Sequence, residues 1–274
     1  MVLTTIAITL LGSCNKNLPP DGFFDPLTGG CQVAAFHNSQ FDMFYPTPPP
    51  YLFQKSFDAT GKIVTGIDCS FTNDIVPQTL PQFTLHLNVV QQGWMVLLID
   101  KPTGIKGDIP DTLGRIYLGR DGRPDSCVGF GLDPFNPEAL TKEHYFYKNG
   151  RLLAVNDIVY YNTEFFFSGT DTISYDRFGN PLSFKHNAYQ YDYNRRVKQQ
   201  YYSDDFMEGD RVFYLLQYLG FFPEVTNPPN VRTRAANVDN PEGVNLTNLQ
   251  FDSEGKLISY GFVTGTNTIT WNCK

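Results

Sequence analysis

The fold class of this chain is set by seven residues, Phe83-Thr84-Leu85-His86-Leu87-Asn88-Val89, in which apolar and polar side chains alternate strictly. A period of two places the four apolar side chains on one face of a β-strand and the polar ones on the other. Gln91-Gln92-Gly93 follows as a turn, and residues 94–99 (WMVLLI) supply a second apolar strand. The two segments therefore predict an antiparallel hairpin.

Similar signals recur along the chain, which is 15% aromatic and contains 23 glycines and 19 prolines. One unit is repeated: an aromatic residue, usually an Asp, a polar turn with Gly, a basic residue or Asn, and a second apolar segment. Its copies are Phe57–Ile63, Tyr175–Leu182 and Phe251–Leu257, with shorter forms at Tyr147–Leu152, Gly119–Arg123 and Tyr191–Val197. Because Asp caps turns and Gly accepts a positive φ, each unit predicts a hairpin turn.

The recurring unit resembles the tyrosine–aspartate (YD) repeats of Rhs-type proteins and of related, largely uncharacterised lipoproteins from Bacteroidetes. The resemblance covers most of residues 51–274. In the Rhs family such hairpins wind into a long curved sheet that can form a shell, so the resemblance implies an all-β fold, a curved antiparallel meander of hairpins. Because the gaps between copies are irregular and only six are recognisable, we expect an open sheet.

One segment departs from the β pattern. Residues 210–219 contain no Gly or Pro, and Val212, Leu215, Leu216 and Leu219 follow helical spacing. Gly220 stands where a helix C-cap is expected. We predict one short helix over 211–219, packed on the concave face or at an end of the sheet.

The N-terminus has the features of an export signal. Residues 2–11 carry no charge and are too few to span a bilayer as a helix. Leu11-Gly12-Ser13-Cys14 resembles the lipobox of bacterial lipoproteins, which implies cleavage between Ser13 and Cys14 and attachment of diacylglycerol to Cys14. No Lys or Arg precedes Cys14, and a start codon placed too far downstream would explain this departure. The alternative is a buried strand over 2–11 with Cys14 as a core thiol.

These features divide the chain into three parts. We predict a signal peptide over 1–13 that is removed, a flexible tether over 14–30 and a single β-rich, repeat-like domain over 31–274. Four cysteines follow the tether, Cys31, Cys69, Cys127 and Cys273. Their even number is compatible with two disulfides in an oxidising compartment, with three connectivities left open by spacing. A bridge between the first and the last would tie the ends of the domain together.

Composition and motifs argue against several classes of function. The net charge of −7 and scattered basic residues disfavour a nucleic-acid partner. No Cys-x-x-Cys or His-x-x-x-His pair occurs, and none of the four histidines lies in a recognisable catalytic motif. We therefore predict no catalytic residue, metal site or cofactor, and consider an enzyme the weaker interpretation.

A cluster of tyrosines provides a functional hint. Tyr189, Tyr191 and Tyr193 share one face of a predicted strand, where aromatic rings stack on sugars or on partner proteins. Cross-strand aromatic packing is the alternative explanation.

Together these features predict an extracytoplasmic lipoprotein of the bacterial cell envelope, anchored to a membrane on its periplasmic or cell-surface side. We expect it to bind a glycan or an envelope protein. Two other functions stay open: a structural or accessory lipoprotein without a small ligand, and a hydrolase with dispersed catalytic residues.

Overall fold

The computed structural model describes residues 24–28, 30–39, 51–71, 83–100, 112–130, 139–184, 187–202, 211–236, 241–262 and 265–274. Seventeen strands form one antiparallel sheet, which confirms the predicted all-β meander of hairpins. The first nine are β1 (Cys31–Asn38), β2 (Phe53–Phe57), β3 (Val64–Phe71), β4 (Phe83–Gln92), β5 (Met95–Asp100), β6 (Thr112–Leu118), β7 (Pro124–Phe130), β8 (Ala139–Lys148) and β9 (Arg151–Tyr161). The others are β10 (Glu164–Tyr175), β11 (Pro181–Phe184), β12 (Asn187–Arg196), β13 (Asn230–Ala236), β14 (Val244–Asn245), β15 (Thr247–Phe251), β16 (Leu257–Phe262) and β17 (Gly265–Cys273).

The sheet curls into a nearly closed barrel. Each strand except β14 pairs with the next along the chain, and β1 pairs with both β2 and β17, so that the two ends of the sheet meet. Within the described residues, no backbone pairing joins β14 to β15. The expectation of an open sheet is therefore wrong. Long twisted sheets curl, and the first and last strands bury Phe36 and Ile269 in the same core.

The recurring units lie at one end of this barrel, which we call the short-turn end. They follow strands that all run toward it, namely β2, β6, β8, β10, β12 and β15. Asp58 shows the predicted turn chemistry, because its Oδ1 accepts hydrogen bonds from the backbone N–H groups of Lys62 and Ile63, both at 3.0 Å. The units are therefore the turns of a barrel meander, and not the YD repeats of a shell.

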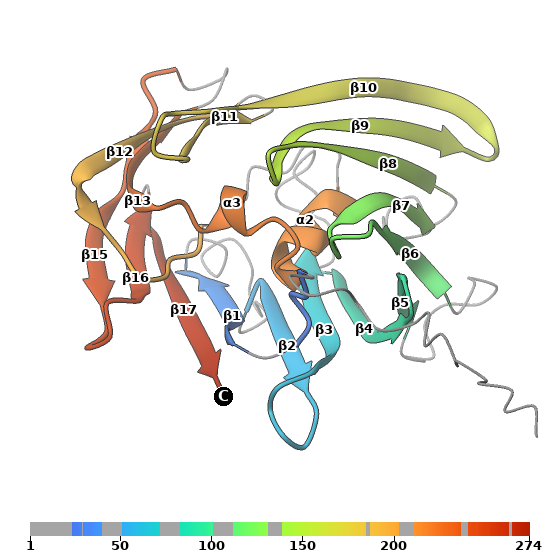
Figure 1. Cartoon of the computed structure of the whole chain (residues 1–274), viewed down its shortest axis with the longest axis horizontal. Helices are drawn as coiled ribbons and strands as arrows, with labels where there is room; N and C mark the ends of the chain where they lie inside the picture. Colours follow the sequence, from blue (N-terminus) through green and yellow to red (C-terminus); the bar gives the residue numbers. More distant parts are fainter. Residues whose placement is uncertain are drawn as a thin grey trace, which may run out of the picture.

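Two helices fill the barrel, α2 (Arg211–Leu219) and α3 (Pro223–Thr226). Figure 1 shows both enclosed by the ring of strands. The predicted helix over 211–219 is thus confirmed, and α3 is an addition that begins with Pro223 in its first turn. Every side chain from Val212 to Leu219 is buried, as expected for a helix that is mostly apolar all round. The barrel interior is consequently a packed core.

The outer face of β17 is polar. On β17, Thr266, Thr268 and Thr270 are exposed, whereas the alternate residues Asn267 and Ile269 face inward and are buried. In the part of the chain that the structure describes, no helix has the length and apolar character needed to cross a membrane.

Candidate functional site

An exposed aromatic surface lies at the end of the barrel opposite the short-turn end. The hairpin of β9 and β10 carries Phe165, Phe166 and Phe167, which are 64%, 67% and 51% exposed. The ring of Phe165 contacts Tyr160 at 6.2 Å between centroids, and that of Phe166 contacts Tyr161 at 4.7 Å. We call these five residues the aromatic arm. Exposed apolar surface of this kind marks interaction sites in soluble proteins.

The aromatic arm also has a strand edge at which another strand could pair. From Glu164 to Thr172, β10 pairs with β9 along one edge, and its pairing with β11 begins only at Ile173. Among the described residues, no strand pairs with the other edge of β10 between Glu164 and Thr170. An unpaired strand edge is a template for an additional strand.

Local sequence explains why the arm is exposed. Successive residues of a strand face opposite sides, so three consecutive phenylalanines cannot all enter one core. The register shifts between Phe165 and Phe167, which leaves Phe166 as the extra residue of a β-bulge. Our sequence-based reasoning missed this site, although the run Phe165-Phe166-Phe167 in a strand-like segment was the signal for it.

The other end of the same two strands forms a polar cluster. β9 and β10 pair as far as Ala154 and Thr172 and then separate, which leaves the backbone of Leu152 without a partner on β10. Side chains replace that strand: the Tyr175 hydroxyl donates to the Leu152 carbonyl at 2.8 Å, and Glu224 accepts from the Leu152 N–H at 2.9 Å. Strand separation is therefore stabilised by side-chain hydrogen bonds.

The buried groups of this cluster have shifted acidities. Burial raises the pKa of Glu224, against the opposing effects of the Leu152 N–H and of Arg123, whose guanidinium lies 3.3 Å away. Burial also raises the pKa of Tyr175, so its hydroxyl stays protonated and remains a donor. Arg123 stacks on Phe24 and Tyr147 at 5.0 and 5.6 Å from the ring centroids.

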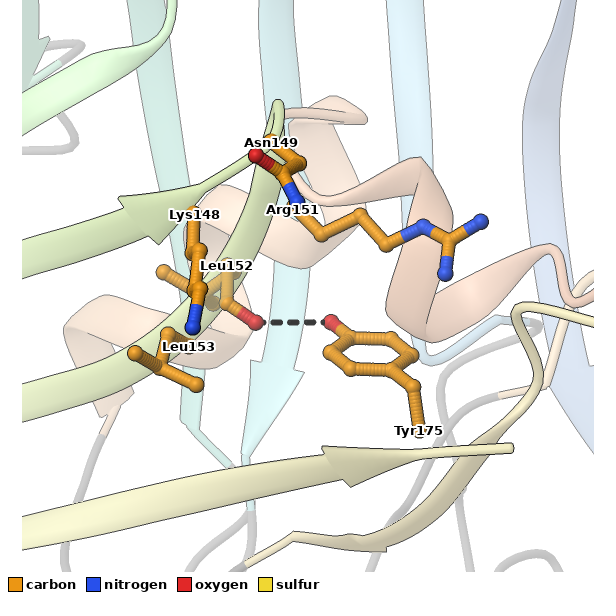
Figure 2. Close-up of a pocket in the computed structure, with 6 residues that line it drawn as sticks. All are labelled: Lys148, Asn149, Arg151, Leu152, Leu153 and Tyr175. Carbon is orange, nitrogen blue, oxygen red and sulfur yellow. Dashed lines mark hydrogen bonds between the residues drawn. The ribbon is translucent and has the colours of Figure 1, made fainter. Parts of the chain in front are cut away.

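A pocket of about 380 Å³ opens where the two strands separate. Figure 2 shows its lining side chains and the hydrogen bond from Tyr175 to Leu152. The lining residues are Lys148, Asn149, Arg151, Leu152, Leu153 and Tyr175. The lining thus combines basic, amide, phenolic and aliphatic side chains and contains no carboxylate.

The three tyrosines proposed for ligand stacking do not form one exposed surface. Tyr189 and Tyr191 are buried, at 4% and 7% exposure, whereas Tyr193 is 48% exposed. Tyr189 packs under the guanidinium of buried Arg232, 4.0 Å from its ring centroid. The Tyr191 hydroxyl donates to the Pro181 carbonyl at 2.7 Å. Tyr189 and Tyr191 thus pack against neighbouring strands, and of the three tyrosines Tyr193 alone is exposed.

The cysteines fall into two groups. Cys31 and Cys273 lie opposite each other in the β1–β17 register and form a disulfide. Cys69 and Cys127 are buried on β3 and β7 and are not disulfide-bonded. Ser13 and Cys14 lie outside the described residues, so cleavage and lipid attachment remain predictions. The expected tether over 14–30 is described only in part, and within it Leu27 is buried at 3% exposure.

Two carboxylates face each other in the barrel wall, outside the described lining of the pocket. Glu143 and Asp157 lie opposite each other on β8 and β9, and both are buried, at 0% and 7% exposure. The Tyr145 hydroxyl donates to Glu143. Among the described residues, no three His, Cys, Asp or Glu side chains gather as a metal-binding group.

The fold defines a class of proteins, the nearly closed antiparallel β-barrels with a filled interior. The chain is similar to the crystal structure of a porin-like protein from Bacteroides uniformis, with 13% identity, a TM-score of 0.52, and coverage of 80% of this chain and 89% of that one. For a porin-like protein from Bacteroides vulgatus the values are 11%, 0.47, 76% and 98%. At this identity the likeness establishes the fold alone. No protein-family model matches the chain, and no curated protein matches it in sequence.

Proposed function

We propose that the chain is a lipid-anchored binding protein of the bacterial cell envelope, and that the aromatic arm docks a protein partner. The observation that carries this proposal is the exposure of Phe165, Phe166 and Phe167, each more than half accessible. Burying such rings is favourable, at about 25 cal/mol per Å² of apolar surface. A partner that covers the arm would gain this free energy.

The chemistry of the arm favours a protein over a glycan. Phenylalanine rings carry no hydrogen-bonding group, whereas sugar recognition needs polar side chains beside an aromatic face. The unpaired edge of β10 offers backbone N–H and C=O groups in a row. An extended protein segment would pair with this edge and place its apolar side chains against the rings.

The position of the arm suits an anchored protein. Phe24, the first described residue, donates its N–H to the Asp121 carbonyl at 2.7 Å and so lies at the short-turn end. Residues 15–23 could extend at most about 30 Å from a lipid on Cys14. The short-turn end would then face the membrane and the arm would point away from it. The fold shared with a protein described as porin-like supports an envelope location by analogy.

Photo-crosslinking tests the docking surface. A photoreactive phenylalanine analogue at position 166 should capture a protein partner in bacterial cells that produce the chain. The matched control is Phe146, which is also exposed, at 51%, but lies on β8 outside the arm. With the purified partner, replacement of all three arm phenylalanines by Thr should lower affinity at least tenfold, and Phe146→Thr should leave it unchanged. Equal capture from both positions would contradict the proposal.

The anchor has its own test. The native protein should partition into detergent, and Cys14→Ser should abolish this. Retention of the variant in the detergent phase would contradict the lipid anchor, whatever the outcome for the arm.

A further inference from the structure

The β8–β9 turn differs from the β15–β16 turn at the short-turn end because, among the described residues, its basic side chains form no ion pair. In the β15–β16 turn, Lys256 lies 3.2 Å from Asp252 and 2.6 Å from Glu254. The β8–β9 turn is Lys148-Asn149-Gly150-Arg151, and Asn149 and Gly150 both have positive φ, of 53° and 73°. Asn-Gly forms such a two-residue turn without any need for Asp. The turn therefore presents two cationic side chains that form no ion pair within the described residues.

Lys148 and Arg151 face each other directly in the β8–β9 register. Like charges at opposed positions destabilise a hairpin by a few tenths of a kcal/mol to about 1 kcal/mol. Within the described part of the chain, neither residue forms an ion pair, in contrast to Arg123 and Lys256. In Figure 2 the two side chains extend away from each other, so each presents its charge separately to a ligand in the pocket.

Both cations line the pocket of about 380 Å³ where β9 and β10 separate. Arg151 is held in place, since its guanidinium lies 5.7 Å from the Tyr175 ring centroid and against Gly179, where a Cβ atom would approach Nη2 to 2.6 Å. Figure 2 shows Arg151 extended above the Tyr175 ring, with Lys148 and Leu153 on the other side of the Tyr175–Leu152 hydrogen bond. The pocket thus has a positioned guanidinium at one side and an aliphatic side chain at the other.

We propose that this pocket binds a carboxylate-bearing saccharide unit. One carboxylate would accept charge-assisted hydrogen bonds from the Arg151 guanidinium. Lys148, on the other side of the Tyr175–Leu152 hydrogen bond, would bind a second carboxylate or a hydroxyl of the same ligand. The sugar ring would pack on Leu153 and Tyr175, and the Asn149 amide would hydrogen-bond to its hydroxyls. The volume lies at the lower end of the range for small-ligand pockets, which suits one or two sugar units.

This site is independent of the aromatic arm, which lies at the opposite end of the same two strands. Titration of the full chain with digalacturonate, followed by ¹⁵N–¹H NMR, should shift the backbone amide signals of Asn149 and Gly150. Arg151→Gln should weaken binding at least tenfold, because one charge-assisted contact is lost. Arg115→Gln is the matched control, since Arg115 is an exposed arginine on β6 away from the pocket. Replacement of the three arm phenylalanines should leave this titration unchanged.

Binding of other ligands distinguishes a saccharide site from a simple anion site. A neutral disaccharide of equal size should bind at least tenfold more weakly than digalacturonate, and inorganic phosphate alone should not match it. Equal binding of phosphate would overturn the saccharide proposal in favour of a simple anion site. No shift of the Asn149 and Gly150 signals at millimolar digalacturonate, or unchanged affinity in Arg151→Gln with retained fold, would overturn it altogether.

Discussion

The carboxylate of Glu224 on α3 lies 3.3 Å from the guanidinium of Arg123, which belongs to the turn between β6 and β7. The same carboxylate accepts the backbone N–H of Leu152 on β9. One buried side chain therefore connects the contents of the barrel to two separate parts of its wall. This contact explains how α3, which has only four residues, is held in a defined position.

Loss of this carboxylate should destabilise the protein. Glu224→Ala leaves the Leu152 N–H without its acceptor and the part-buried Arg123 guanidinium with only the exposed Asp121, 3.7 Å away. We expect the free energy of unfolding to fall by about 2–3 kcal/mol in urea denaturation. The control is Glu242→Ala at an exposed position, which should change stability by less than about 0.5 kcal/mol. Equal effects of the two variants would contradict the structural role of Glu224.

A buried lysine should make stability depend on pH. Burial lowers the pKa of Lys55 to about 7, and its Nζ donates to the Leu219 carbonyl at the end of α2. Between that pH and the unfolded-state value near 10, the unfolded chain binds more protons at this site than the native protein. The free energy of unfolding should therefore rise with pH in this window, by up to about 1.4 kcal/mol per unit from this group, and below pH 7 the contribution is constant.

Lys55→Met should remove this part of the slope in denaturant titrations between pH 7 and 10. Lys62→Met, which replaces an exposed lysine in the neighbouring turn, should retain it. An unchanged slope in Lys55→Met would show that Lys55 is not the group responsible.

The disulfide between Cys31 and Cys273 should contribute strongly to stability. It joins positions 242 residues apart, so it removes much of the conformational freedom of the unfolded chain. The Cys31→Ser/Cys273→Ser variant should lose about 2–5 kcal/mol and show a lower Tm than the oxidised protein. Reductant should lower the Tm of the native protein and leave that of the variant unchanged. A reductant effect of equal size on both would contradict this assignment.

The aromatic arm should be dispensable for folding. Because its phenylalanines are mostly exposed, replacing all three with Thr should change the free energy of unfolding by less than about 1 kcal/mol. Phe213→Ala, at a fully buried position on α2, should cost about 3–5 kcal/mol in the same assay. A large loss in the arm variant would mean that the arm supports the fold rather than a partner.

The packed interior predicts that the barrel does not conduct ions. Every side chain of α2 from Val212 to Leu219 is buried, and such dense packing is expected to exclude a continuous water path along this helix. Planar bilayer recordings with the purified protein should show no discrete conductance steps. Reproducible steps that disappear on denaturation would contradict this prediction.

Several features of the candidate sites could not be predicted from local sequence. Burial of Tyr189 depends on Arg232, a residue of β13 that is distant in the chain. The pocket depends on the separation of β9 from β10 and on the approach of Tyr175 to Leu152. By contrast, the pairing of Lys148 with Arg151 follows from the Lys-Asn-Gly-Arg turn, because a two-residue hairpin fixes its own register.

By itself, the sequence determined the local elements of this protein. The alternation in Phe83–Val89 placed Leu85 and Leu87 in the core. The Asp–Gly turns and the helix over 211–219 lie at the positions that their local sequence predicts. These outcomes rest on interactions within a few residues of the chain. Closure of the barrel, enclosure of α2 and exposure of the aromatic arm were decided by tertiary structure. They depend on which strands distant in sequence, such as β1 and β17, share the same core.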